Sequence, residues 1–216
     1  KFWGYAKDLE FTDCVFNQET SYNIWTYSSN ATFKDCKFYC KGRSVLIYNE
    51  GATMNNPAEI KFNNCEFYAS EKYEEKAAIE ISTYAYPHQA GSFNVEINNC
   101  SATGFDTKTK AGGVVLSAGL ANLKEIGVGR LLVNIDGEIV YCDFNIINKT
   151  QIKGYNTIKE AIDEAMAGDE IFVSAGTYDI NTITLTKPIS IIGEVDEQGT
   201  KLTKISRFIP DSSVSV

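Results

Sequence analysis

Cysteine is the residue type whose number and spacing first suggest chemistry in this chain. The 216 residues include six cysteines and a single histidine, His88. Zinc sites of structural type need closely spaced ligand pairs, but no Cys-x-x-Cys pair occurs, since Cys36 and Cys40 are four residues apart. The sequence therefore predicts no zinc site. We interpret His88 as a solvated loop residue, because no motif places a nucleophile or an orienting acid beside it.

Four of the cysteines occupy one position of an internal repeat. The segments Leu9–Phe16, Ala31–Phe38, Ile60–Phe67 and Val95–Ala102 all read apolar-x-apolar-x-[Asp/Asn]-Cys-x-[Phe/Ala]. The alternating start predicts a strand with one buried face, and Asp or Asn before cysteine favours a left-handed turn. We therefore expect the chain to bend at Asp13, Asp35, Asn64 and Asn99.

A second β-rich run follows each of these segments. These runs are residues 23–27, 44–48, 78–82 and 113–117. They predict a repeating unit of two strands and two loops, with loops that lengthen along the chain while the strand motif stays fixed. Strands repeated in one direction without intervening helices are typical of a parallel β-helix, in which each coil stacks only on its neighbours.

The repeated motif resembles the coil of the right-handed parallel β-helix in the pectin-lyase-like superfamily, where asparagine turns and stacked interior side chains recur. The resemblance covers most of residues 9–117. It implies an all-β fold, a right-handed parallel β-helix solenoid. The resemblance does not indicate a particular activity, because the superfamily includes lyases, esterases, hydrolases, phage tail proteins and non-catalytic surface proteins.

The pattern changes after Leu123. Asp136-Gly137 between two apolar runs predicts a tight hairpin. A capping box from Thr157 to Glu160 predicts one short amphipathic capping helix near residues 157–167, ended by Gly168. Its apolar face would consist of Ile158, Ala161, Ile162, Ala165 and Met166.

Residues 155–193 resemble the opening of a pectin-lyase-like domain, through this helix and the motif from Gly168 to Tyr178. We therefore predict two domains. Residues 1–148 would form β-helix coils that end in the hairpin. Residues 149–216 would form the capping helix and the opening coil of a second β-helix, or a cap packed on the first. An opening motif that follows four coils also predicts that the sequence belongs to a longer chain.

The repeat places Cys14, Cys36, Cys65 and Cys100 inside the coils, as small apolar fillers. Stacked parallel Cβ vectors are poorly disposed for disulfide bonds, so we expect free thiols. Asp13 and Asp35 would lie one coil apart and are a calcium candidate, since calcium prefers carboxylate oxygens and pectate lyases use such clusters. A simple turn ladder is the favoured alternative, because Asn64 and Asn99 continue the same column.

Aromatic residues indicate function better than the cysteines and aspartates do. A group of them lies in or just after the second run of successive repeats: Trp25, Tyr27, Tyr48, Tyr84 and Tyr86. A shallow row of aromatic faces is a surface on which sugar rings stack, and we take these five as the candidate ligand-binding residues. Packing in the core or at turns is the alternative, because alternation sends some of them inward.

The composition of the chain excludes several classes of function. A net charge of −8 with three arginines argues against nucleic-acid binding, and no apolar run approaches the roughly 18 residues of a membrane span. We predict a non-catalytic, extracellular or cell-surface segment that binds a polysaccharide, another glycan or a protein partner. No catalytic residue and no cofactor beyond the calcium candidate is predicted. The alternatives are a polysaccharide lyase or hydrolase, with Lys37 or Arg43 as the nearest base, and a structural spacer of a larger surface or phage-tail protein.

Overall fold

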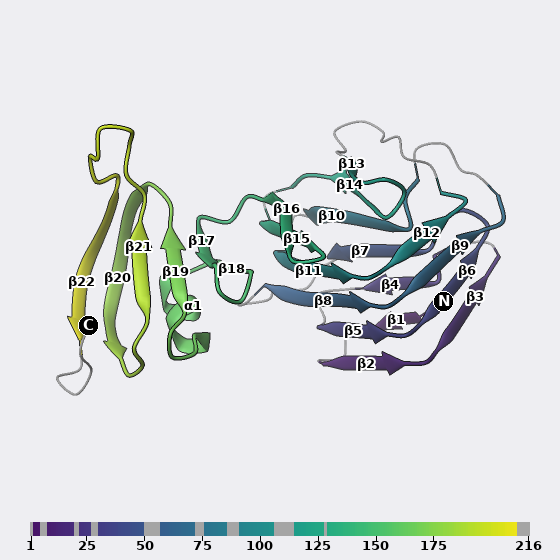
Figure 1. Ribbon diagram of the computed structural model, residues 1–216, viewed down its shortest axis with the longest axis horizontal. Helices are drawn as coiled ribbons and strands as arrows, with labels where there is room; N and C mark the ends of the chain where they lie inside the picture. The colour runs from purple at the N-terminus through teal and green to yellow at the C-terminus, as the bar shows by residue number, and fades with distance from the viewer. Residues whose placement is uncertain are drawn as a thin grey trace. The chain divides into compact units, whose positions relative to one another are not determined.

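The computed structural model describes residues 2–4, 8–19, 22–26, 30–49, 57–71, 76–85, 91–105, 115–127 and 129–210. The chain forms two compact units, Lys1–Tyr141 and Cys142–Val216. Both are built of β-strands, and among the described residues α1 is the one helix (Figure 1). The predicted all-β class with one short helix is therefore confirmed. No helix in the described part of the chain is long and apolar enough to cross a membrane.

Three sheets, here named A, B and C, make up the first unit. Sheet A has the order β1 (Phe2–Gly4), β4 (Ile24–Thr26), β7 (Val45–Asn49), β10 (Ile79–Ala85), β14 (Ala121–Glu125) and β13 (Val115–Ser117). Sheet B has the order β16 (Glu138–Cys142), β15 (Leu131–Ile135), β11 (Phe93–Asn98), β8 (Ala58–Asn63), β5 (Ala31–Lys34) and β2 (Leu9–Thr12). Sheet C has the order β12 (Ser101–Thr103), β9 (Glu66–Ala69), β6 (Lys37–Cys40) and β3 (Val15–Gln18).

The chain visits sheets A, B and C in turn, and each of the first four repeats adds one parallel strand to each sheet. Strands β2, β5, β8 and β11 run side by side, and β3, β6, β9 and β12 continue from them in a different direction (Figure 1). The repeating unit thus has three strands. The expected unit of two strands was wrong because each aligned segment is itself two strands, separated by the Asp-Cys or Asn-Cys turn.

The four predicted bends are confirmed. Asp13, Asp35, Asn64 and Asn99 have φ angles of 55°, 54°, 54° and 48°, in the left-handed region that Asp and Asn tolerate better than most residues. The amides also form a ladder, since Asn99 Nδ2 donates to Asn64 Oδ1 at 2.8 Å and Asn64 Nδ2 donates to Asp35 Oδ1 at 3.0 Å. The turns of successive repeats are therefore joined by their side chains as well as by the backbone.

Stacked phenylalanines fill the interior of the first unit. One column stacks Phe11 on Phe33 at 5.2 Å and Phe33 on Phe62 at 5.0 Å, measured between ring centroids. The other stacks Phe16 on Phe38 at 4.8 Å and Phe38 on Phe67 at 4.7 Å. Phe33 and Phe38, which each stack on a ring at both faces, have no exposed surface.

The repeated cysteines line this interior. Cys36 and Cys65 are fully buried and Cys14 and Cys100 are partly buried, and all six cysteines are free thiols. The thiols of Cys36, Cys65 and Cys100 each reach the carbonyl oxygen two residues earlier, at 3.2, 3.4 and 3.3 Å. Burial raises the pKa of the Cys36 thiol, which keeps it protonated and able to donate to that oxygen.

The predicted hairpin after the fourth repeat is confirmed. Asp136 and Gly137 have φ angles of 51° and 86°, and they join β15 to β16, which are neighbours in sheet B. Two central residues with positive φ are the signature of a tight type I′ turn.

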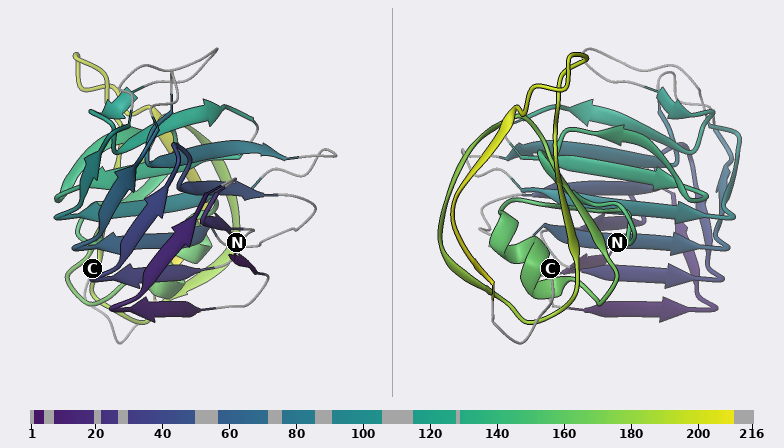
Figure 2. Two further views of the ribbon diagram at one scale, coloured as in Figure 1. Left: turned by 90° about the vertical axis from the view of Figure 1, so that its right-hand side faces the viewer. Right: turned by 60° about the vertical axis from the view of Figure 1, so that its left-hand side comes forward.

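The second unit has a four-stranded sheet, a two-stranded sheet and the helix. The first sheet has the order β18 (Lys153–Tyr155), β17 (Ile146–Asn148), β19 (Glu170–Val173) and β21 (Ser190–Gly193), and β19 and β21 are parallel. The second pairs β20 (Gly176–Leu185) with β22 (Thr203–Pro210), also in parallel. Figure 2 shows α1 (Ile158–Glu164) alongside these strands.

The helix begins as predicted. Thr157 is the N-cap, and its side chain and that of Glu160 form the reciprocal capping box. Ile158, Ala161 and Ile162 are buried, but Met166 is 62% exposed, so its assignment to the apolar face was wrong. The helix ends at Glu164, because the backbone of Ala165 is already extended. The predicted end near residue 167, at Gly168, was therefore wrong.

A buried carboxylate fixes the chain on either side of this helix. Asp169 is 2% exposed, and its Oδ2 accepts hydrogen bonds from Asn148 Nδ2 at 2.7 Å, Gln151 Nε2 at 2.5 Å and the Met166 backbone N–H at 2.8 Å. Burial by itself would raise the pKa of Asp169, but these hydrogen bonds outweigh burial and lower the pKa below its usual value.

Candidate functional site

The predicted aromatic residues that the structure describes belong to sheet A. Trp25 in β4 and Tyr48 in β7 lie on neighbouring strands, with ring centroids 6.3 Å apart. Tyr27 and Tyr86 lie outside the described residues. Tyr84 belongs to β10, but its side chain lies outside the described part of the chain.

Trp25 is part of a cluster on the outer face of sheet A. Ile24, Ile47 and Ile79 point into the core, so alternation sends Trp25, Leu46 and Glu80 outward, where they form one column across β4, β7 and β10. Leu46 and Glu80 are nevertheless only 2% exposed. Outward-facing residues are this well buried only where other side chains cover them.

Tyr22 is one of those covering side chains. Its hydroxyl donates a hydrogen bond to the Glu80 carboxylate, and its ring lies 6.3 Å from that of Trp25. Lys76 Nζ lies 2.6 Å from Glu80 Oε1, and the Arg43 guanidinium lies 5.8 Å from the Tyr22 ring centroid. Burial, together with the neighbouring Glu80 charge, strongly raises the pKa of Tyr22. The phenol therefore stays protonated, and the cluster holds the face together by packing and an ion pair.

The predicted calcium candidates lie at two successive turns. The Asp35 carboxylate accepts the Asn64 amide hydrogen bond, which is the role that the turn-ladder interpretation gives it. In the described residues no group of three or more His, Cys, Asp or Glu side chains is arranged to hold a metal ion. Of the two bases nearest in sequence, Lys37 pairs with Glu66 at 3.3 Å, and Arg43 lies against Tyr22.

An accessible aromatic surface lies instead on the outer face of sheet C. Tyr39 in β6 and Tyr68 in β9 are register partners, with ring centroids 5.0 Å apart and planes 10° apart. Tyr39 is 40% exposed. We call this pair the tyrosine platform. Its column is completed by Asn17 on β3, next to Tyr39, and by Thr103 on β12, next to Tyr68.

Side chains beneath and beside the platform hold it in place. The neighbouring Phe38 and Phe67 point inward and stack, so alternation directs both tyrosines outward at nearly the same spacing. The Tyr68 hydroxyl donates to the Glu66 carboxylate, which raises the pKa of Tyr68. Because Glu66 also pairs with Lys37, the position of the Tyr68 ring is restrained by its own strand and by the next.

A hollow of about 340 Å³ adjoins the platform. It is lined by Asn17, Gln18, Glu19, Tyr39, Cys40, Lys41, Tyr68, Ala69 and Ser70. Backbone hydrogen bonds from Ser70 N to Cys40 O at 2.9 Å and from Glu71 N to Lys41 O at 2.7 Å fix the rim. Tyr39 meets Tyr68 on one ring face, and the register position on its other side is Asn17, whose side chain is smaller than a ring. That face of Tyr39 therefore leaves room for a ligand.

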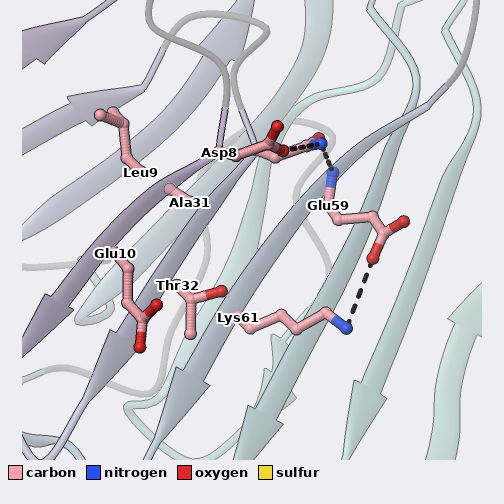
Figure 3. A pocket seen from close by; sticks show the side chains of 8 residues that line it. Asp8, Leu9, Glu10, Ala31, Thr32, Glu59 and Lys61 are labelled. Carbon is pink, nitrogen blue, oxygen red and sulfur yellow. Dashed lines mark hydrogen bonds and ion pairs between the residues drawn. The ribbon is translucent and has the colours of Figure 1, made fainter.

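A second hollow, of about 320 Å³, lies over sheet B (Figure 3). Four of its polar residues are bonded to one another: Asn30 Nδ2 donates to Asp8 Oδ1 at 2.9 Å, the Glu59 backbone N–H donates to Asn30 Oδ1 at 2.9 Å, and Lys61 Nζ lies 3.3 Å from Glu59 Oε2. Its lining contains no aromatic residue. The hollow beside the tyrosine platform is therefore the stronger candidate for a binding site.

Sequence reasoning missed the platform, although the repeat contains a signal for it. The third and fourth residues of Cys36-Lys-Phe-Tyr39 and Cys65-Glu-Phe-Tyr68 are the same in two consecutive repeats. If phenylalanine points inward, the tyrosine after it must point outward.

No family model, no curated protein and no solved structure matches the chain.

Proposed function

We propose that the first unit is a non-catalytic, carbohydrate-binding parallel β-helix, and that the tyrosine platform and the adjoining hollow form its binding site. The observation that carries this proposal is the pair of parallel rings on an outer sheet face, next to a hollow lined by amides. The order in which the chain visits sheets A, B and C supports the parallel β-helix. The repeated Asp and Asn turns support the finer assignment to the right-handed, pectin-lyase-like type.

A sugar ring has an apolar face of C–H groups and a rim of hydroxyls. The exposed face of Tyr39 matches the first of these, since an aromatic side chain offers a large rigid surface with little entropy to lose on binding. Asn17 matches the second, because its side-chain amide both donates and accepts hydrogen bonds. The volume of the hollow, about 340 Å³, is in the lower part of the usual range for small-ligand pockets.

The charged groups around the platform favour binding over acid–base catalysis. Glu66 is paired with Lys37 at 3.3 Å and Glu71 with Lys41 at 3.4 Å. General acid–base catalysis by a carboxyl group uses a shifted pKa near the working pH, whereas the Tyr68 and Lys37 hydrogen bonds lower the pKa of Glu66. This carboxylate therefore stays ionised and holds the platform.

A glycan array with the full chain tests the proposal, using Tyr39→Ala, Trp25→Ala and Val15→Ala. Val15 is a matched control, since it is 67% exposed on the same sheet face. We expect binding that Tyr39→Ala weakens roughly tenfold and that the other two variants retain. Loss with Trp25→Ala alone would move the site to sheet A. Absence of binding by the folded wild-type chain would favour the structural-spacer alternative.

A further inference from the structure

The lysines and glutamates beside the tyrosine platform form ion pairs, and these pairs affect whether the platform favours a neutral or a charged sugar. Two lysines, Lys37 and Lys41, lie near the rings, and they are paired with Glu66 and Glu71. Glu19 also lines the hollow. The described surface around the platform thus has two positive charges and three negative ones, with each lysine already facing a carboxylate.

We infer that the ligand of the platform is a neutral polysaccharide, built of uncharged hexose or pentose units, and not a polymer of uronic acids. This inference rests on the proposed function. Strong recognition of a carboxylated sugar uses charge-assisted hydrogen bonds from a cation that faces the ligand's carboxylate. Among the described residues, both lysine ammonium groups near the platform face glutamates of the protein.

The surface ion pairs are weak, so a lysine could turn from its glutamate toward an anionic ligand. That exchange brings no gain, however, because the glutamate it leaves would then face the same polymer. If Lys41 turned toward a uronate, Glu71 would lose its partner beside it and Glu19 would remain in the hollow. The net negative charge of the described residues around the platform therefore disfavours an anionic chain.

The column of the platform also indicates how a linear ligand would lie. Asn17, Tyr39, Tyr68 and Thr103 follow one another on β3, β6, β9 and β12, and neighbouring strands of a sheet are about 4.8 Å apart. A linear chain lying along this column would contact a ring near its middle and polar side chains on both sides. Uncharged hydroxyls suit Asn17 and Thr103, which offer hydrogen bonds without charge.

The test compares binding of the full chain to neutral glucan, mannan and xylan oligosaccharides with binding to oligogalacturonates, at low and at high salt. We expect binding to at least one neutral series that changes little with salt, and that Tyr39→Ala weakens roughly tenfold. The variant Glu71→Gln releases Lys41, so it should gain affinity for oligogalacturonates that salt suppresses, while neutral binding stays unchanged. The matched control is Glu170→Gln, which breaks a comparable exposed ion pair with Lys149, at 3.2 Å, in the second unit.

The outcomes separate the two proposals. Salt-sensitive binding of oligogalacturonates by the wild-type chain, lost in Tyr39→Ala, would overturn the inference and leave the carbohydrate site in place. Failure of the folded chain to bind either class would overturn both. An unchanged preference in Glu71→Gln would show that the Lys41–Glu71 pair does not set selectivity, and the inference would fall on that ground.

Discussion

Tyr39 and Tyr68 stack on the outer face of sheet C at nearly the spacing of the phenylalanines beneath them, 5.0 Å against 4.7 Å between ring centroids. Both pairs of rings follow the same register between β6 and β9. One strand register therefore positions both the core phenylalanines and the tyrosines that we propose bind sugar.

The core column should dominate the stability of the first unit. Phe38→Ala removes a fully buried ring that stacks on two others, and it should lower the free energy of unfolding by about 3–5 kcal/mol. Val15→Ala on the outer face should change it by less than about 0.5 kcal/mol. Urea unfolding followed by circular dichroism measures both, and similar values for the two variants would contradict the observed register.

At the Asn64 turn, the stability lost on substitution should depend on how well the new residue tolerates a positive φ angle. Its φ of 54° is strained for alanine and free for glycine, so Asn64→Ala should cost about 1–2 kcal/mol. Asn64→Gly removes the same ladder hydrogen bonds without that strain, and should cost less. Thermal melts of the two variants check this order, and a glycine variant less stable than the alanine variant would refute it.

Cys36→Ser should destabilise the chain more than Asp35→Asn. The serine places a hydroxyl and a smaller atom in an apolar column, and we expect a loss of about 1 kcal/mol, moderated because the Lys34 carbonyl oxygen lies within reach of the side chain. Asp35→Asn keeps a residue type that the next two turns already use. Equal melting temperatures would count against an interior position for the cysteine column.

These turn and core predictions show what could be learned from the sequence. The bends at Asp13 and Asn64 and the capping box of Thr157 were predictable, because they depend on residues within a few positions of one another. The three-strand unit was missed because the Asp-Cys pair looks like a bend within one strand. Contacts such as that between Tyr22 and Glu80, which are 58 residues apart, depend on stacking register and leave no local signal.

Acid should weaken the second unit through Asp169. Its pKa is lower in the folded chain than the ordinary value near 4 of an unfolded one. Its stabilising contribution is therefore complete above that ordinary value and is lost as pH falls through the lower, folded pKa. Asp169→Asn should remove this part of the pH dependence and cost about 2 kcal/mol at neutral pH. Acid titrations followed by circular dichroism compare the two proteins, and identical acid transitions would exclude this role.

The tyrosine platform is most directly tested by calorimetric titration of a neutral oligosaccharide that the array selects, into the full chain and into Tyr39→Phe and Tyr39→Ala. We predict that Tyr39→Phe, which keeps the ring, binds within about threefold of wild type, while Tyr39→Ala binds roughly tenfold more weakly with the same melting temperature. Equal affinity of all three proteins for the sugar would contradict this prediction.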